Sequence, residues 1–281
     1  MKLFKKILKI IGLVILAIIL VSIIAYTILV ICTSPSNNRN WAKDMGQLAS
    51  AEISTTTIKI SNIRDINYRG VLDYDLKYKN ETFDISKITK AYLFTDPFGK
   101  LSAHTMLGFE FSDGKRVVLS VEVRREVGEW FSGIKGILRQ YELIFVWATE
   151  KDVVKLRTNH RGDNVYMYEM KMAKPNIEKL FVAAVMRTNK LVKKPEFYNT
   201  LTNNCTTNLA NLLQNVYNKP IVVDWKYLAP AYAEALSMKY DLIDGPDIPT
   251  VRATHNISPL AKKCGDCDNY SEEIRKILLT N

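Results

Sequence analysis

Residues 103–124 read AHTMLGFEFSDGKRVVLSVEVR, and this stretch determines the centre of the fold. Its first and last nine residues are strand-like runs in which apolar side chains recur at every second position. The Ser-Asp-Gly between them, at 112–114, places glycine where a three-residue loop needs a left-handed backbone. The stretch therefore predicts a β-hairpin.

The loop length also sets the register of the hairpin, because the side-chain period of a strand is two. With three residues in the loop, Glu110 faces Arg116, and counting back places His104 opposite Glu122. A two-residue loop would instead place Val123 opposite the histidine. The first register is favoured because it sets opposite charges against each other at Glu110 and Arg116.

The sequence on either side of the hairpin predicts an α+β domain whose strands lie mostly in the first half. Alternating apolar runs indicate strands, and apolar stripes at helical spacing indicate helices. Strands are expected at 58–62, 70–79, 88–94, 141–148, 152–156 and 165–171, and helices at 176–189, 204–217 and 227–240. An irregular tail is expected after the last helix.

An almost unbroken apolar segment, Ile10–Ile31, precedes the domain. As a helix it would cover ~33 Å, enough to cross the hydrocarbon core of a bilayer. A cleaved signal peptide has a shorter apolar region, and a lipoprotein signal needs a small residue before its cysteine, whereas Ile31 precedes Cys32. The segment is therefore interpreted as an uncleaved transmembrane anchor.

Charge predicts the orientation of this anchor. Lys2, Lys5, Lys6 and Lys9 precede it, and no acidic residue appears before Asp44. By the positive-inside rule the N-terminus lies in the cytoplasm, so the main domain is expected in the periplasm or another extracytoplasmic space. The expected plan is an anchor with its lysines at 1–32, a polar linker at 33–40, the main domain at 41–260 and a C-terminal tail at 261–281.

Composition narrows the classes of partner and cofactor. Without the four N-terminal lysines, basic residues outnumber acidic ones by 35 to 29, but they form no dense run, which suits anionic lipid headgroups and argues against nucleic acid. Cys264 and Cys267 form a CxxC pair, interpreted as a local disulfide or as two thiols. One such pair, with three histidines in the whole chain, is weak evidence for a metal, and neither a metal nor a cofactor is predicted.

The main candidate for chemistry is Cys205, which opens the predicted helix 204–217 after two asparagines that can cap it. The helix dipole and free amide groups favour a thiolate there and could hold an oxyanion. Polar neighbours in TNNCTTN argue against the alternative of a small buried hydrophobe. His104 could take the thiol proton, with Glu122 holding its ring, although a structural histidine is the alternative.

Other polar residues are weaker candidates. Basic and aromatic side chains could grip an anionic headgroup near the membrane, but ordinary surface ion pairs explain them equally well. A compact polar cluster could support the site or simply form a turn. The substrate-binding candidates are Arg124, Arg125, Arg139, Tyr141 and Asn204, and the supporting candidates are Asn62, Arg64 and Asp65.

Several segments in fixed order resemble the outward-facing domain of the Lnb-type lipoprotein N-acyltransferase family. The resemblance runs from about Asn40 to about Leu260, and its motifs are far more specific than a lone cysteine and histidine. The matching segments are NIRDINYRG at 62–70, AHTMLGFEF at 103–111, LSVEVRRE at 119–126, RQYELIFVWATEKDVVKLRTN at 139–159 and FYNTLTNNCTTNL at 197–209.

The resemblance implies a thiol-dependent enzyme of a bacterial cytoplasmic (inner) membrane, with Cys205 as nucleophile, His104 as base and Glu122 as acid. Because the histidine precedes the cysteine, it also implies a circularly permuted papain-like fold, similar to the lecithin:retinol acyltransferase group. The implied reaction moves an acyl chain from a phospholipid or lipoprotein ester, through a thioester, to the N-terminal amine of a lipoprotein. Some members carry a further membrane-embedded portion, which leaves open a membrane protein partner.

Two other functions remain open at this point. A thiol hydrolase, whether amidase, peptidase or lipase, would use the same pair and let water accept the acyl group. A non-catalytic anchored binding protein would hold Cys205 and His104 too far apart to interact.

Overall fold

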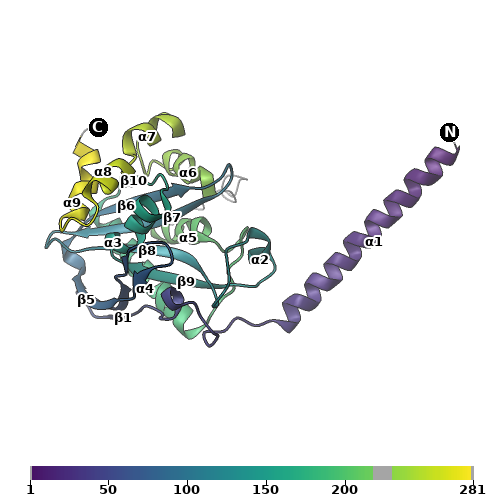
Figure 1. Cartoon of the computed structure of the whole chain (residues 1–281), viewed down its shortest axis with the longest axis horizontal. Coiled ribbons are helices and arrows are strands. Elements are labelled where there is room, and N and C mark those ends of the chain that lie inside the picture. Colours follow the sequence, from purple (N-terminus) through teal and green to yellow (C-terminus); the bar gives the residue numbers. More distant parts are fainter. Residues whose placement is uncertain (1, 218–229, 280–281) are drawn as a thin grey trace.

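The computed structural model describes residues 2–217 and 230–279, and it confirms an α+β fold preceded by one long apolar helix (Figure 1). The helix α1 (Lys2–Cys32) buries none of its residues and is long and apolar enough to cross a membrane. The strands are β1 (Ser50–Ile53), β2 (Thr57–Arg64), β3 (Asn67–Tyr68), β4 (Tyr74–Asp75), β5 (Tyr78–Asp84), β6 (Ile88–Pro97), β7 (Ala103–Phe111), β8 (Arg116–Arg124), β9 (Glu142–Ala148) and β10 (Tyr166–Glu169).

The helices of the domain are mostly in its second half. They are α2 (Gly133–Ile137), α3 (Glu150–Lys155), α4 (Lys174–Lys193), α5 (Cys205–Tyr217), α6 (Ala233–Lys239), α7 (Ile248–His255), α8 (Ser258–Cys264) and α9 (Tyr270–Arg275). Short 3-10 turns occur at Lys43–Met45, Ile85–Lys87, Pro230–Tyr232 and Lys276–Leu279, and a π-helical turn at Leu156–Arg161 follows α3.

Most of the strands form one sheet in the order β1-β2-β9-β8-β7-β6-β10, with β5 also paired to β2. The predicted hairpin is its centre. Glu110 pairs with Arg116 and Met106 with Ser120, and Gly114 in the loop has a φ of 82°. The three-residue loop and its register are therefore confirmed.

Helices cover both faces of this sheet, because the central strands alternate their side chains between two cores. Leu119 and Trp147 face the larger core, which contains the buried side of α4 and α5. Val118 and Ile144 face a second core that contains residues of α3, α8 and α9. The predicted helix 176–189 is confirmed as α4, which begins two residues earlier, at Lys174, and has Pro175 in its first turn. Phe181 packs edge-on against Trp147 at 5.6 Å between ring centroids.

Three predictions about secondary structure were wrong. Of the strand expected at 70–79, only β4 and the first two residues of β5 are strand, and the remainder is irregular. The expected strand at 152–156 is the helix α3, which Thr149 caps by accepting a hydrogen bond from the amide of Asp152. The adjacent apolar residues of α3 are buried, and such a pair is typical of a strand when the helix cap before it is not taken into account. The expected irregular tail forms α7, α8 and α9, and it buries Tyr270 and Ile274 in the second core.

Two further details concern the C-terminal part. Cys264 and Cys267 form a disulfide, which decides between the two interpretations of the CxxC pair. Of the helix predicted at 227–240, residues 227–229 lie outside the described residues, residues 230–232 form a 3-10 turn, and α6 covers 233–239.

The segment that follows α1 contacts the domain within a few residues of the end of this helix. The amide of Ser36 donates to Glu142 at 3.0 Å, and the side-chain amide of Asn37 donates to the carbonyl of Val192 at 2.9 Å. Arg39 forms an ion pair with Glu142 at 2.8 Å. From Ser36 onward, these contacts therefore fix the chain to the domain.

A buried ion pair joins β2 to α3. Nη2 and Nε of Arg64 lie 2.8 and 3.0 Å from the carboxylate oxygens of Asp152, which also accepts from the amide of Ile66 at 2.9 Å. Both side chains are almost fully buried. Loss of one partner would leave the other charge buried and uncompensated, which is more costly than the pair itself is stabilising.

We therefore expect Asp152→Ala to lower the free energy of unfolding of the domain by ~3–5 kcal/mol. The matched control is Glu169→Ala, which removes an exposed ion pair to Lys90 of similar length, 2.7 Å, and is expected to cost under ~1 kcal/mol. Urea unfolding of the detergent-solubilised chain, followed by circular dichroism, measures both values. Equal costs for the two variants would show that the buried pair has no special role.

Candidate active site

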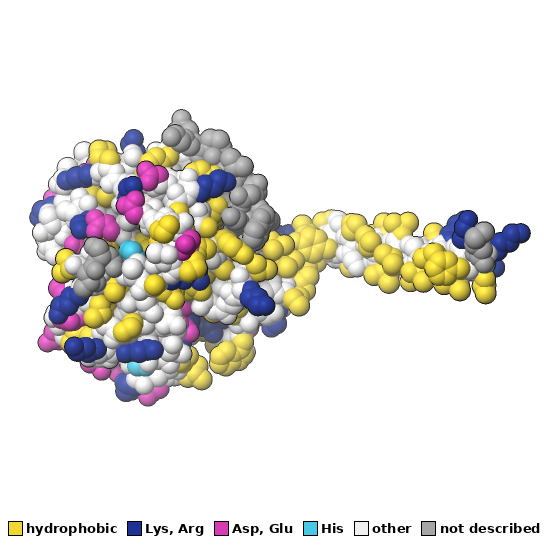
Figure 2. All heavy atoms as spheres, turned by 90° about the horizontal axis from the view of Figure 1, so that it is seen from above, with side chains coloured by type: hydrophobic (Ala, Val, Ile, Leu, Met, Phe, Trp, Pro, Cys, Tyr) yellow, Lys and Arg dark blue, Asp and Glu magenta, His cyan; other side chains and the backbone are white. Residues whose placement is uncertain are grey.

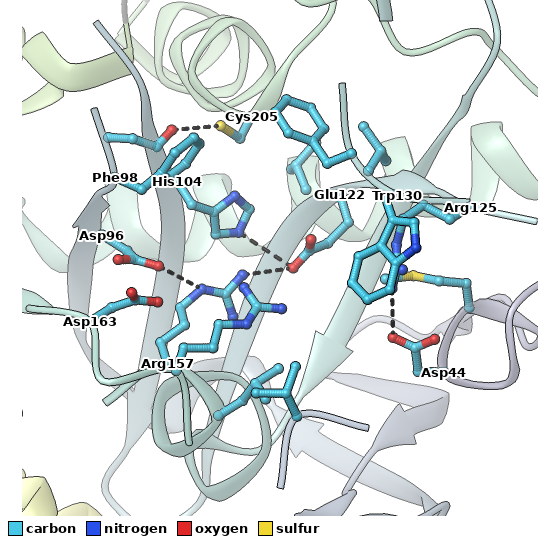
Figure 3. Close-up of a pocket in the computed structure, with 18 of the residues that line it drawn as sticks. Asp44, Asp96, Phe98, His104, Glu122, Arg125, Trp130, Arg157, Asp163 and Cys205 are labelled. Atoms are coloured by element: carbon cyan, nitrogen blue, oxygen red, sulfur yellow. Dashed lines mark hydrogen bonds and ion pairs between the residues drawn. The ribbon is translucent and has the colours of Figure 1, made fainter. Parts of the chain in front are cut away.

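A cavity of about 430 Å³ opens where α5 begins beside the first residues of β7 (Figure 3). Cys205, His104 and Glu122 all line it. The residues come from α5, β7 and β8, so three segments distant in sequence meet there. The structure therefore brings together the three side chains proposed for catalysis, as Figure 3 shows with the ring of His104 lying between Cys205 and Glu122.

Cys205 is the first residue of α5 and is buried. Asn204 caps the helix, because its side-chain oxygen accepts from the amide of Thr207 at 2.9 Å. The amides of Cys205 and Thr206, in the first turn, have no acceptor within the helix and are available to an oxyanion. The thiol donates to the carbonyl of Ala103 at 3.8 Å, and no hydrogen bond joins it to the ring of His104 among the described residues.

The hydrogen bonds of His104 determine its tautomer. The Ser120 hydroxyl donates its single proton to Oε1 of Glu122 at 2.7 Å. Nε2 of His104 lies 2.6 Å from the same hydroxyl oxygen, so Nε2 must carry a proton and donate it. Nδ1 therefore has a free lone pair, and it has no hydrogen-bond partner in the described part of the chain. A general base needs such a lone pair.

Burial keeps this histidine neutral. It lowers the pKa of His104 to about 3; Glu122 opposes this shift and Arg157 adds to it. The carboxylate of Glu122 lies 3.4 Å from Nε2. Above pH 4 the neutral imidazole is therefore the main form.

Glu122 is ionised despite its burial, which opposes ionisation. His104, Arg157 and the Ser120 hydroxyl together hold the pKa of Glu122 well below its ordinary value. Arg157 provides the most direct contact, because its Nη2 donates to Oε1 of Glu122 at 3.0 Å. The carboxylate is therefore a fixed negative charge beneath the ring.

Arg157 itself is buried and lies between two acids. Its Nε is 3.2 Å from Oδ2 of Asp96, although the N–H is not aligned for a hydrogen bond. Burial raises the pKa of Asp96 to about 6, with Arg157 opposing that shift. The π-helical turn Leu156–Arg161 directs Arg157 and Arg161 into the cavity, and such turns often occur at functional sites.

The substrate-binding candidates divide into two groups. Arg125 lines the cavity and forms an ion pair with Asp44 at 3.2 Å. Arg124 is buried away from the cavity, donates to the carbonyls of Met45 and Gly46, and stacks over Trp41 at 4.1 Å.

Three other substrate-binding candidates also stabilise the fold and do not line the cavity. Arg139 donates to the carbonyl of Val30 in α1, and Tyr141 donates to the carbonyl of Trp130 at 2.6 Å, which fixes the loop before α2. Asn204 serves as the helix cap described above.

The supporting candidates lie outside the cavity as well. Arg64 holds α3 through Asp152, and Asp65 accepts from the hydroxyl of Thr149 at 2.8 Å. Asn62 donates to the carbonyl of Leu48 at 3.0 Å. Arg64 and Asp65 thus fix the start of the helix that leads into the π-helical turn carrying Arg157.

Sequence reasoning missed three residues of the site. Ser120 lies two residues before Glu122 on the same strand, so the alternation of the strand could have placed it on the same face. Arg157 and Asp96 gave no such signal, because their contact depends on the π-helical turn. Within residues 2–217 and 230–279, no group of three or more His, Cys, Asp or Glu could hold a metal ion.

Comparison with known proteins assigns the chain to a family. Residues 74–231, more than half of the chain, match the family model described as the Lnb N-terminal periplasmic domain. This match includes both Cys205 and His104. Comparisons with curated proteins and with solved structures find no significant match. The extent of the family match shows that this chain, an α+β domain behind a candidate transmembrane helix, belongs to the Lnb periplasmic domain family.

Proposed function

We propose that the protein is a membrane-anchored cysteine acyltransferase that acts outside the cytoplasmic membrane. Cys205 would take an acyl chain from a phospholipid or lipoprotein ester and pass it to the N-terminal amine of a lipoprotein. The observation that carries this proposal is the free Nδ1 lone pair of His104 in the cavity that also contains the Cys205 thiol. A circularly permuted papain-like relationship is part of the same proposal.

The first half-reaction follows from these groups. The thiol turns from the carbonyl of Ala103 toward His104, and Nδ1 takes its proton as the sulfur attacks the ester carbonyl. The amides of Cys205 and Thr206 stabilise the oxyanion that forms. The ester C–O bond then breaks, the departing alkoxide takes the proton from Nδ1, and a thioester is left on Cys205.

The second half-reaction runs in the opposite sense. An amine attacks the thioester carbonyl, His104 takes the proton lost by the nitrogen, and the thiolate leaves and recovers that proton. Water in place of the amine would give a hydrolase, so the chemistry of the acceptor separates these two functions. Glu122 stabilises the imidazolium that forms in each half-reaction.

Two features support a location outside the cytoplasm. The family is named for a periplasmic domain, and α1 could serve as a single membrane span. The disulfide between Cys264 and Cys267 is a bond typical of oxidising compartments. With the N-terminal lysines in the cytoplasm, the domain would lie on the periplasmic side.

We expect a hydroxylamine-labile acyl adduct when the full chain is incubated with phospholipid and diacyl lipopeptide in micelles. Intact mass spectrometry measures it. The adduct should be lost in Cys205→Ser and kept in Cys32→Ser, which removes the other free cysteine of the described chain. An adduct that survives in Cys205→Ser would place the nucleophile elsewhere. The absence of any adduct on the wild type would favour a binding protein.

We expect Ser120→Ala to slow thioester formation about tenfold, since one hydrogen bond of ~1 kcal/mol or slightly more orients the ring of His104. His104→Gln should cost more, ~100-fold or above, because it removes the base itself. Single-turnover kinetics in micelles measure both rates. Ser120→Thr, which keeps the hydroxyl, should recover part of the loss if it folds; wild-type rates in Ser120→Ala would exclude this role for the hydroxyl.

We expect the rate of thioester formation to stay level as pH falls from 7.5 to about 5. The base must be neutral, and burial lowers the pKa of His104 to about 3, so protonation of the ring begins only well below the ordinary range. A pH profile of kcat/KM for the full chain tests this. An acid limb centred near 6.5 that is absent from the unfolding profile would show that His104 titrates as an exposed histidine.

A further inference from the structure

The mouth of the cavity carries an exposed apolar rim. Among the described residues outside α1, thirteen large hydrophobic side chains are exposed, and eight of them lie in only three loops around this mouth, which marks the surface as a binding face. The rim consists of Val71 and Leu72 before β4, Phe98 and Leu101 between β6 and β7, and Val127, Trp130, Phe131 and Ile134 between β8 and the end of α2.

The three loops belong to one surface. Five of the eight side chains line the cavity, so they surround a single opening. Phe98 and Phe131 meet edge to face at 6.4 Å between ring centroids, which joins two of the loops. Figure 2 shows hydrophobic side chains gathered on the part of the domain beside the anchor helix.

Contacts with α1 indicate how deep this rim would lie relative to a membrane that α1 spans. The hydroxyl of Tyr26 donates to the carbonyl of Ile137 at the end of α2, and Arg139 donates to the carbonyl of Val30 at 3.2 Å. Tyr26 lies six residues before Cys32, the last residue of α1, which corresponds to ~9 Å along the helix axis. If α1 spans a bilayer, α2 therefore lies level with the outer end of the span.

The chemistry of the rim fits that depth. Trp130, with 67% of its surface exposed, is of the residue type enriched at membrane interfaces. Lys100 and Lys135 lie in the same loops and form no ion pair with any described residue, so they are available to phosphate groups of lipids. A rim that binds a soluble protein would have no need to lie level with the outer end of α1.

We propose that this rim docks into the outer leaflet of the membrane that holds α1, so that the cavity opens onto lipid. Interfacial segments typically bury their apolar side ~5–10 Å below the headgroups, in agreement with the depth set by Tyr26. A lipid ester can then reach Cys205 without leaving the leaflet. Only this last consequence rests on the proposed function; docking itself requires no chemistry.

The experiment measures the depth of Trp130 in the full chain reconstituted into nanodiscs. Quenching of tryptophan fluorescence by phospholipids brominated near the top of their acyl chains reports contact with the leaflet. The difference between the wild type and Trp130→Phe isolates the signal of Trp130. We expect more than half of this signal to be lost in brominated nanodiscs, and the same loss in a Cys205→Ser background, which separates docking from catalysis.

The matched control moves the tryptophan to the opposite end of the domain. Leu279 is 85% exposed near the C-terminus, which lies far from α1 (Figure 1). Trp130→Phe/Leu279→Trp should show almost no quenching. In the wild-type tryptophan background, Leu101→Glu/Ile134→Glu should reduce the quenching of Trp130, because both side chains are exposed and neither lines the cavity.

Two results would overturn docking. Equal quenching at positions 130 and 279 would show that the domain has no fixed face toward the membrane. A Trp130 that bromolipids do not quench, but that is also shielded from aqueous acrylamide, would show that a protein or a second copy of this chain covers the rim. In either case a thioester on Cys205 would still support the proposed function.

Discussion

The pairing of β7 with β8 is the constraint on which the site depends. Register sets which side chains share a face, and a slip of one residue would turn His104 and Glu122 to opposite sides of the sheet. An ion pair near the loop and one core on each face of the sheet hold the pairing of β7 with β8. The pairing therefore tolerates no such slip. The chemistry at one end of the hairpin is thus determined by the geometry of the turn at the other.

A second constraint is the balance of charge beneath the ring. Glu122 alone would be costly to bury, and Arg157 alone would be equally so. Together they leave a local charge near neutral. In the proposed mechanism, His104 is uncharged at rest, and the carboxylate of Glu122 stabilises the ring when it accepts a proton. The resting state and the reacting state therefore use the same fixed groups.

The features that sequence predicted were those with a local period or cap. The hairpin, the apolar anchor and the cysteine at the start of a helix each follow from a few adjacent residues. The strand expected at 152–156 failed because Val153 and Val154 favour strand, whereas the cap at Thr149 and the buried Asp152 favour helix. Arg124, Arg139 and Tyr141 resemble ligand contacts in sequence, but their partners are carbonyl groups that only the fold brings near.

The contact of the linker at Ser36 also limits how far the domain can move from α1. Only three residues, 33–35, separate α1 from the first of these linker contacts. At full extension three residues span ~10 Å. If α1 spans a membrane, the domain cannot diffuse through the bulk of its compartment, and it meets other molecules only by lateral diffusion within one membrane plane. Under the proposed function, turnover should then scale with the number of substrate molecules per unit area of bilayer, and dilution of the surrounding fluid should leave it unchanged.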